Sequence, residues 1–456
     1  METRKAPEEI VPGKATHDTP DTPQALIEFM RTDWADAPLR VSNLAHRERY
    51  AERRAELSRA FPGETLVVPA GIELTRANDT AFRFRPSSDF AYLAGAAAEP
   101  GSLLIFQPRG TGHETIMYVP AHNRGEKEYF IDRVHGELWV GRHRGVDESQ
   151  LYFGVDRCRS LGEIPQALEA LSAQQNVRVI RGNDPRVDSA LNESPGDADF
   201  ATHISEMRLI KDAVEIAELR RCCEVSKRAF EDVIRILPRA KSEREVEAAF
   251  WSRARIEAND VGYLTIAAAG EHACTLHWSH NHGQIVQSDL LLLDAGVEVE
   301  SLYTADITRT LPIGGKFSAE QRAVYDLVYR AQQAAFAQVM PGNDFLEPNR
   351  AAMRVLAQGL IDLGILHESL EVALDPSNQF YRRYTLHNVS HMLGIDVHDC
   401  AKARNETYRY GALRAGMVLT VEPGLYFQPD GRAVPRDAPG IGCVNSQDHA
   451  HGCRLA

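Results

Sequence analysis

The feature that most constrains the fold is an apolar run that ends in a carboxylate. Residues 289–312 read DLLLLDAGVEVESLYTADITRTLP, so a leucine run ends at Asp294 and a second aspartate, Asp306, opens an alternating segment. The stretch between them can fold back as a hairpin, which would place the two carboxylates side by side. Two unpaired carboxylates there repel each other and lose hydration, and a bound divalent cation would remove both problems. Alternatively, either aspartate caps a strand end or pairs with an arginine such as Arg309.

A second segment is dense in histidine. Residues 384–400 read YTLHNVSHMLGIDVHDC and contain His387, His391 and His398. A helix would place His387 and His391 on one face, because they are four residues apart. Imidazole is a ligand for Zn, Mn, Fe or Co and can also carry protons. Each histidine alone could be a hydrogen-bonded core residue, but the cluster favours a functional role.

Two further residues complete the candidate set. Glu422 ends an apolar strand in GMVLTVEPGLYF, where the following Pro-Gly can hold a carboxylate rigidly. His277 lies beside Trp278 on a predicted strand or strand end, where it could bind substrate or pack against its neighbour. The order Asp, Asp, His, Glu resembles a two-metal hydrolase site, in which a bridging water becomes a nucleophile. The sequence contains no Gly-x-Ser-x-Gly elbow, Walker loop or Rossmann fingerprint that would compete with this interpretation.

The length of 456 residues predicts two or three domains, at about 100–200 residues each. We expect a disordered tail over 1–22, a linker over 193–204, and helices at 318–339 and 346–363. Short apolar runs with helical segments between them predict an α/β N-terminal domain, and strands mixed with separate helices predict an α+β C-terminal domain. The predicted boundaries are a flexible extension over 1–42, an N-terminal domain over 43–195 and a C-terminal domain over 200–456.

Composition excludes several classes of protein. The formal net charge of −13 argues against general nucleic-acid binding, which needs a basic surface. No segment has the length and apolarity of a membrane-spanning helix, and the first residues lack the apolar core of an export signal. Seven cysteines, an odd number with no CxxC pair, are typical of reduced thiols. The sequence therefore predicts a cytoplasmic protein without nucleic-acid or membrane partners.

Three quoted segments resemble the aminopeptidase P branch of the creatinase, prolidase and methionine aminopeptidase superfamily. They are DAGVEVESLYTADITRTLPIGGKFS, LHNVSHMLGIDVHD and LTVEPGLYF, which match that branch's metal and proton-shuttle motifs. In the N-terminal half, FRFRPSSDFAYLAGAAAEPGSLLIF resembles the same branch, allowing for one extra alanine. Methionine aminopeptidases lack this N-terminal domain and creatinases lack the carboxylate ligands, so the resemblance favours aminopeptidase P.

The resemblance implies a C-terminal "pita-bread" catalytic domain that holds two Mn²⁺ ions, with Co or Zn as possible substitutes. By position, the implied metal ligands are Asp294, Asp306, His391 and Glu422, with Asp306 bridging. Glu422 would also accept a proton from the bridging water, while substrate binding, oxyanion stabilisation and proton shuttling fall to His277, His387 and His398. The implied activity is removal of an N-terminal residue that precedes proline, by a metal-bridging hydroxide, in a homo-oligomer that acts on peptides with proline in the second position.

The chain departs from the family pattern in three places. Asp294 and Asp306 are one residue further apart than usual, and Ala91 stands where related SDFWYF segments have tryptophan. The family's last strand reads roughly GIGxRIEDD, whose Glu bridges both metals, whereas this chain reads GIGCVNSQDHAHGCRLA and has Ser446 at that position. We therefore expect the C-terminal end to be atypical or truncated. Two alternatives stay open: an Xaa-Pro dipeptidase (prolidase), and an inactive pita-bread binding protein that lacks the last bridging glutamate.

Overall fold

The computed structural model describes residues 23–34 and 39–428, and the chain divides into two compact units after Ile204. The tail predicted to be disordered (1–22) and the atypical ending after Gly442 lie outside the described residues. Among the described residues, no helix has the length and apolarity needed to cross a lipid bilayer.

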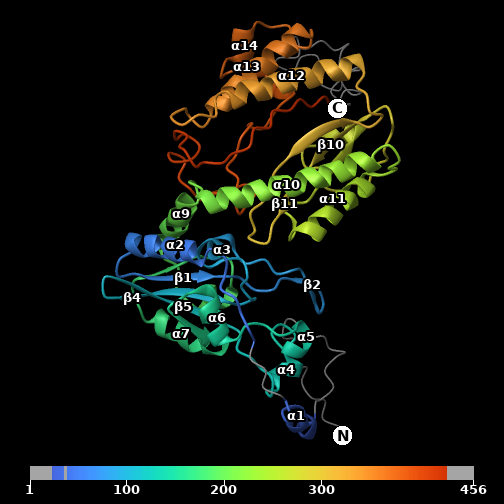
Figure 1. Ribbon diagram of the computed structural model, residues 1–456. Helices are drawn as coiled ribbons and strands as arrows, with labels where there is room; N and C mark the ends of the chain where they lie inside the picture. The colour runs from blue at the N-terminus through green and yellow to red at the C-terminus, as the bar shows by residue number, and fades with distance from the viewer. Residues whose placement is uncertain (1–22, 35–38, 429–456) are drawn as a thin grey trace, which may run out of the picture. The chain divides into compact units, whose positions relative to one another are not determined.

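A mixed five-stranded sheet forms the centre of the first unit, in the order β6-β5-β4-β1-β7 (Figure 1). Strands β1 and β4 are antiparallel, as are β4 and β5, whereas β7 runs parallel to β1 and β6 parallel to β5. Their bounds are Thr65–Pro69 (β1), Leu103–Arg109 (β4), Gly112–Val119 (β5), Arg157–Ser160 (β6) and Val177–Val179 (β7), and a small ribbon pairs Thr75–Ala77 (β2) with Thr80–Ala81 (β3). The apolar runs of the N-terminal half are therefore strands, as predicted.

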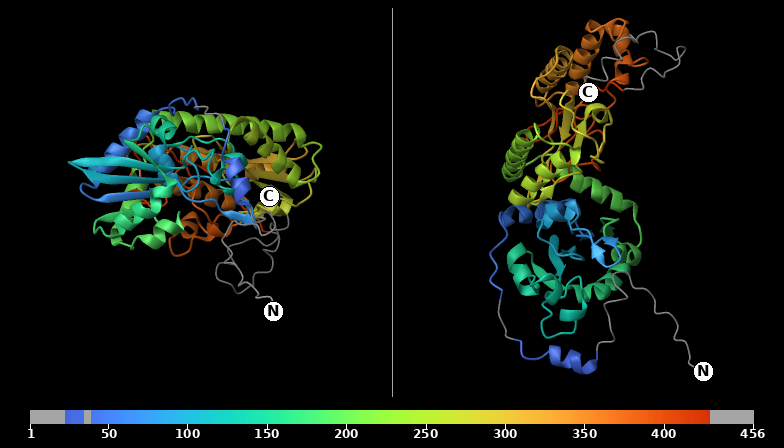
Figure 2. Two further views of the ribbon diagram at one scale, coloured as in Figure 1. Left: turned by 90° about the horizontal axis from the view of Figure 1, so that it is seen from below. Right: turned by 90° about the vertical axis from the view of Figure 1, so that its right-hand side faces the viewer.

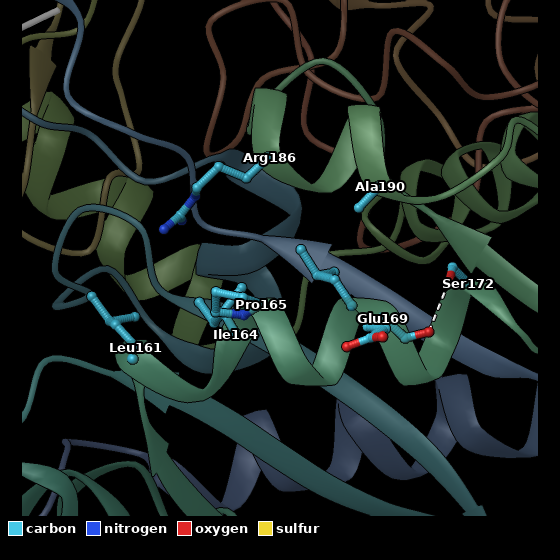
Figure 3. A pocket seen from close by; sticks show the side chains of 9 residues that line it. Leu161, Ile164, Pro165, Glu169, Ser172, Arg186 and Ala190 are labelled. Carbon is cyan, nitrogen blue, oxygen red and sulfur yellow. Dashed lines mark hydrogen bonds between the residues drawn. The ribbon is translucent and has the colours of Figure 1, made fainter. Parts of the chain in front are cut away.

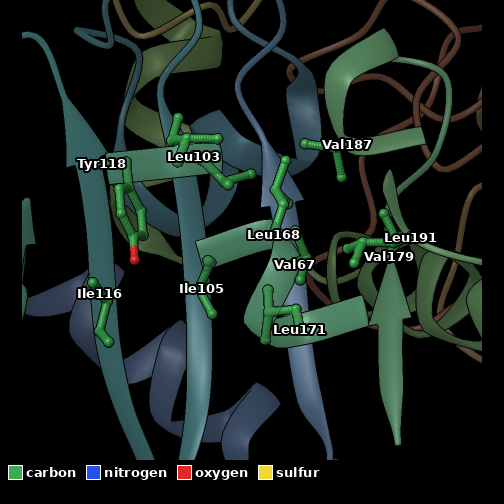
Figure 4. Close-up of a cluster of buried hydrophobic side chains, with 11 residues drawn as sticks. Val67, Leu103, Ile105, Ile116, Tyr118, Leu168, Leu171, Val179, Val187 and Leu191 are labelled. Carbon is green, nitrogen blue, oxygen red and sulfur yellow. The ribbon is translucent and has the colours of Figure 1, made fainter. Parts of the chain in front are cut away.

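One face of this sheet is covered by α7 (Ile164–Ser172) and α8 (Pro185–Ala190). Figure 4 shows Leu168 and Leu171 of α7 beside Val67 of β1 and the alternating residues Leu103 and Ile105 of β4. Alternate residues point to the same side of a strand, which gives this core its period of two. The residues between them point to the other face of the sheet. They are buried too, because α2 (Arg47–Ala60) contacts β5 and α3 (Ser88–Ala94) contacts β1.

The prediction of a linker over 193–204 is wrong, because residues 195–204 lie in helix α9, Pro195–Met207. Ser194 and Asp197 cap the helix start, since the Gly196 amide donates to the Ser194 hydroxyl and the Ser194 amide to the Asp197 carboxylate. Phe200 and Ile204 are fully buried. Polar composition suggested a linker, but the burial of these two apolar side chains determines the structure. The unit's other helices are Gln24–Met30 (α1), Glu128–Ile131 (α4), Glu137–Val140 (α5), Val146–Phe153 (α6) and the short 3₁₀ helix Leu161–Glu163 (η1).

The second unit combines two helix pairs with a three-stranded antiparallel sheet in the order β12-β10-β9 (Figure 1). The strands are Ile266–Ala269 (β9), Leu290–Asp294 (β10) and Thr308–Pro312 (β12), and Asp260–Val261 (β8) pairs with Val297–Glu298 (β11). The helices are Ala213–Ile236 (α10), Glu243–Glu257 (α11), Ala319–Phe336 (α12), Glu347–Asp362 (α13), Leu370–Leu374 (α14), and the 3₁₀ helices Gly270–Cys274 (η2) and Phe380–Arg383 (η3). The α+β prediction and the two helices expected near 318 and 346 are confirmed.

Helices α10 and α11 pack against each other, as do α12 and α13 (Figure 1 and Figure 2). Helix α11 begins after Ser242, whose hydroxyl accepts a hydrogen bond from the Glu245 amide. The Glu245 carboxylate accepts from the amide of Lys241, one residue before the cap.

Candidate metal centre

The predicted hairpin is confirmed: β10 and β12 are antiparallel, and Asp294 lies opposite Thr308. The pairing of the two strands continues without a bulge as far as Ala305, whose amide donates to the Val297 carbonyl. The one additional residue between Asp294 and Asp306 therefore lies in the turn of the hairpin. A side chain at Gly296 would meet the Ala305 carbonyl oxygen at 1.7 Å, so only glycine fits there. Asp306 is two residues from Thr308, so both carboxylates lie on the same face of the hairpin.

The hydroxyl of Tyr263 joins the two aspartates. It lies 2.5 Å from Oδ1 of Asp294 and 2.9 Å from Oδ1 of Asp306. Burial, with the negative charges of both aspartates, raises the pKa of Tyr263 well above its usual value. Burial and the nearby charge of Asp306 raise the pKa of Asp294 to about 6. The sequence carried no signal for Tyr263, because it precedes Asp294 by a long stretch and belongs to no quoted motif.

His391 and Glu422 lie on two extended segments that run antiparallel. The Glu422 amide donates to Val389 at 2.9 Å, and the Thr420 amide donates to the His391 carbonyl at 3.0 Å. The helix considered for His387 and His391 is therefore wrong, because the backbone groups of this segment pair with residues 418–422 instead of with each other.

The acidic and imidazole groups converge at the His391 ring. Its Nε2 lies 3.1 Å from Oδ2 of Asp306 and 3.1 Å from Oε1 of Glu422. One ligand atom from each of these three residues lies within 4.8 Å of the others. Burial alone would lower the pKa of His391, but its hydrogen bonds with Asp306 and Glu422 outweigh burial and raise that pKa to about 10. Nδ1 faces the Met392 carbonyl at 3.0 Å, which leaves Nε2 for an ion.

This donor set fits a divalent cation. Three carboxylates and one imidazole are the oxygen and nitrogen ligands that Mn²⁺, Co²⁺ and Zn²⁺ accept. Asp294, Asp306 and Glu422 are all at least partly buried, and the raised pKa values of Asp294 and His391 show that protons stabilise the cluster in the absence of a cation. Ser446 and the other residues near the expected last ligand lie outside the described residues.

The remaining predicted histidines lie around this cluster. The ring of His398 is 4.4 Å from that of His391, and burial, followed by the charge of His391, lowers the pKa of His398. The charge of His277 also acts on His398, so His277 lies near the same group. His387 lies at the other end of its segment, where its Nε2 is 2.9 Å from the hydroxyl of Tyr426, a residue the sequence reasoning did not single out.

The predicted strand around His277 is wrong. His277 lies in a turn after η2, because the Thr275 amide donates back to His272 and ends the 3₁₀ helix. Trp278 packs away from His277: its ring stacks on His272 at 3.9 Å and its N–H donates to Glu243 at 2.8 Å. His277 is therefore not held by its tryptophan neighbour.

A buried ion cluster anchors the loop that carries His398. Asp399 accepts from Lys211 Nζ at 2.8 Å and also pairs with Arg208, and all three side chains are almost completely buried. Arg208 donates to Asp396 at 2.7 Å as well. The two cations precede α10 and the two aspartates flank His398 in sequence, so this network fixes the path of the chain on both sides of that histidine.

A pocket of about 470 Å³ lies in the first unit, lined by residues of η1, α7 and α8 (Figure 3). Its walls include Leu161, Pro165, Glu169 and Arg186. None of the predicted catalytic or metal-binding residues lines it, so this pocket is separate from the candidate metal centre.

The chain is similar to known proteins along most of its length. Residues 217–454 match the model of metallopeptidase family M24, and residues 50–180 match the aminopeptidase P N-terminal domain. Xaa-Pro aminopeptidase 1 of Streptomyces coelicolor is 45% identical over 448 residues, covering 97% of this chain and 90% of the relative. Xaa-Pro aminopeptidase of Escherichia coli is 32% identical over 419 residues, covering 88% of this chain and 91% of the relative.

Solved structures agree with the family match. Zinc-substituted E. coli aminopeptidase P in complex with product superposes with a TM-score of 0.76 at 30% identity, covering 88% of this chain and 91% of that one. The same enzyme with the inhibitor Pro-Leu gives a TM-score of 0.75. The second unit thus has the pita-bread fold expected from the sequence, and the chain belongs to metallopeptidase family M24 with an aminopeptidase P N-terminal domain.

Proposed function

We propose that this chain is a metal-dependent Xaa-Pro aminopeptidase, which hydrolyses the bond between an N-terminal residue and a following proline. The observation that carries the proposal is the convergence of Asp306, His391 and Glu422 next to Asp294. The relatives that bear the name Xaa-Pro aminopeptidase align over nearly the whole chain, so the proposal concerns both units. Its substrates are peptides with proline in the second position.

The proposed ligands of two Mn²⁺ ions are Asp294, Asp306, His391 and Glu422, with Co²⁺ or Zn²⁺ as substitutes. When bound, such ions act as Lewis acids and lower the pKa of water to near neutrality. Tyr263 holds the two aspartates at a fixed separation. The Thr420 hydroxyl donates to Oε1 of Glu422 at 2.7 Å, which orients this carboxylate as a proton acceptor.

Three histidines are proposed to handle substrate and protons. The lowered pKa of His398 keeps this ring neutral, so one nitrogen can donate a hydrogen bond to a developing oxyanion while the other stays free of a proton. His387 shares a hydrogen bond with the Tyr426 hydroxyl, which orients the ring to bind substrate or carry a proton. His277, in the turn after η2, is proposed to contact the substrate.

The choice of substrate separates this proposal from the prolidase alternative. Purified protein supplied with Mn²⁺ is given the tripeptide Xaa-Pro-Xaa and the dipeptide Xaa-Pro, with initial rates followed by chromatography. An aminopeptidase cleaves the tripeptide much faster, since it binds residues beyond proline. Equal or faster cleavage of the dipeptide would replace the proposal by a prolidase. An otherwise identical tripeptide with alanine in the second position is the control and should remain uncleaved.

A binding protein on the same fold is the second candidate, because Ser446 stands where the family has a bridging glutamate. A binding protein of this kind would retain peptides with proline in the second position without turnover. Metal content and turnover measured on the same sample distinguish the two functions.

We further propose that the chain is cytoplasmic, forms a homo-oligomer, and contains an N-terminal domain over 43–195 and a pita-bread domain over 200–456. The five described cysteines, all free thiols, support the location. Light scattering tests the assembly, and limited proteolysis with mass spectrometry tests the domain boundary.

A further inference from the structure

A second group of metal-ligating side chains lies in the first unit, where the catalytic proposal uses no residue. The N-terminal cluster consists of His122, Glu137, His143 and Glu148. His122 lies in the loop after β5, Glu137 is the first residue of α5, His143 precedes α6, and Glu148 lies in its first turn. One ligand atom from each of His122, Glu137 and His143 lies within 4.8 Å of the others.

The His122 ring lies between two carboxylates. Its Nδ1 is 2.7 Å from Oε1 of Glu137, and its Nε2 is 3.1 Å from Oε1 of Glu148. The Glu137 side chain is only 2% exposed, so its negative charge lacks the solvation of a surface carboxylate. Burial would raise the pKa of Glu148, but hydrogen bonds, including one from His122, lower it. The His122 ring is thus the basic group that faces both carboxylates, in a position that a metal ion can also fill.

The second histidine has a hydrogen-bonding conflict that an ion would resolve. His143 is buried, with Nδ1 at 3.1 Å from the Arg144 carbonyl oxygen and Nε2 at 3.2 Å from that of His135. A neutral imidazole has one N–H, so one nitrogen presents a lone pair to an acceptor. The His143 ring also stacks parallel to that of His122, at 5.9 Å and 6°. A bond from that nitrogen to a cation would remove this conflict.

The chain leaves space for this arrangement at Gly145. A side chain there would come within 2.5 Å of His122 Cδ2 and 2.9 Å of Glu148 Oε2. The backbone of Gly145 has a φ of −79°, which any residue adopts, so glycine is required for space and not for conformation. The close approach of His122 to the start of α6 therefore depends on the absence of a Cβ.

We propose that His122, Glu137 and His143 bind a Zn²⁺ ion, with Glu148 orienting His122. Two imidazoles and a carboxylate are borderline ligands that suit Zn²⁺ at about 2.0–2.2 Å, with water completing a tetrahedron. The ion takes the place of the hydrogen shared by His122 and Glu137, while Nε2–H continues to donate to Glu148. A carboxylate on the far nitrogen of a ligating histidine is the usual outer partner of a zinc site. Bound zinc would fix α5 and α6 to the end of β5.

Zinc content of the full chain tests this site once the catalytic centre is disabled. The background is the double variant Asp306→Asn, His391→Ala, freed of metal, incubated with Zn²⁺ alone and desalted. We expect about one zinc per chain to remain, because the N-terminal cluster has the ligand number of a zinc site. Adding His143→Gln or Glu137→Gln should remove it, whereas the matched control His113→Gln, a histidine of the same unit outside the cluster, should retain it.

Two measurements keep the test decisive if one variant folds poorly. Glu148→Gln in the same background should weaken zinc affinity by about 10–100-fold without removing the site. Zinc should also raise the melting temperature of the background chain but not that of the variant with His143→Gln. No zinc retained by the background, or equal retention with and without His143→Gln, would overturn the proposal and leave His122 as a charged hydrogen-bond bridge between two carboxylates.

Discussion

The two histidine–carboxylate groups are built on different kinds of scaffold. The catalytic residues come from a strand hairpin and a pair of extended segments, so strand register fixes Asp294, Asp306, His391 and Glu422. The N-terminal cluster uses a loop and the starts of two short helices. Strand register brings together residues that are far apart in the sequence. Loops bring together residues that are already near each other in the sequence. Rigid strands suit a reaction that needs fixed geometry, and loops suit an ion that itself supplies the rigidity.

Removing a ligand from the catalytic group should have the largest effect. Asp306→Asn removes a charge shared by Tyr263 and His391, and metal ions supply several kcal/mol of transition-state stabilisation. Cleavage of Xaa-Pro-Xaa should fall on the order of 10³-fold or more, at 1.36 kcal/mol per tenfold. Asp362→Asn, an exposed aspartate of α13, is the control and should keep full activity. Substantial turnover by the Asp306 variant would remove this residue from the centre.

Outer partners offer a sharper comparison, because each group has one. Tyr263→Phe leaves the Asp294 and Asp306 carboxylates without their shared hydroxyl and should weaken Mn²⁺ binding by about 10–100-fold. Metal titration followed by activity measures this change. The zinc content of the N-terminal cluster should be unchanged in the same variant. A loss at both sites would show that the two groups are not independent.

Proton release on metal binding tests the charge state of the catalytic group. In the metal-free protein the pKa of His391 is raised to about 10, so the ring carries a proton at pH 7 that an ion must displace. Mn²⁺ affinity should therefore rise about tenfold per pH unit below that pKa, if this single proton dominates. Calorimetry in buffers of different ionisation enthalpy should give close to one proton released. Binding without proton release would exclude His391 as a ligand.

The smallest effect on stability is expected for a carboxylate that pairs with an arginine instead of a histidine. Arg404 donates two hydrogen bonds to Glu206, and these lower the pKa of Glu206 to about 2 from 4.5. This contribution to stability is present above pH 4.5 and is lost as pH falls towards 2. Glu206→Gln should cost no more than about 1 kcal/mol at pH 7, and the difference should shrink in acid. Urea unfolding measures it, with exposed Glu224→Gln as the control.

Much of the catalytic group could be predicted because it follows local patterns. The leucine run before Asp294 predicted a buried strand, and the return segment with Asp306 predicted its partner. The extended path around His391 could not be predicted, because its hydrogen-bond partners lie some thirty residues later, near Thr420. Periodicity of four residues fits a helix and an extended chain equally well, so spacing alone did not distinguish them.

Other features depended on tertiary contacts that no local pattern reports. Tyr263 joins Asp294 to Asp306 only after the hairpin has formed. The polar segment that became α9 is ordered by burial of Phe200 and Ile204, which its composition did not suggest. The N-terminal cluster has no regular spacing between its histidines and glutamates, so only the fold brings it together.

Anomalous diffraction from crystals soaked in Mn²⁺ shows directly whether the four proposed ligands bind metal. We expect manganese peaks about 2.0–2.3 Å from carboxylate oxygens of Asp294, Asp306 and Glu422 and from Nε2 of His391. Manganese absent from this group in a fully loaded crystal, or bound only elsewhere, would contradict it.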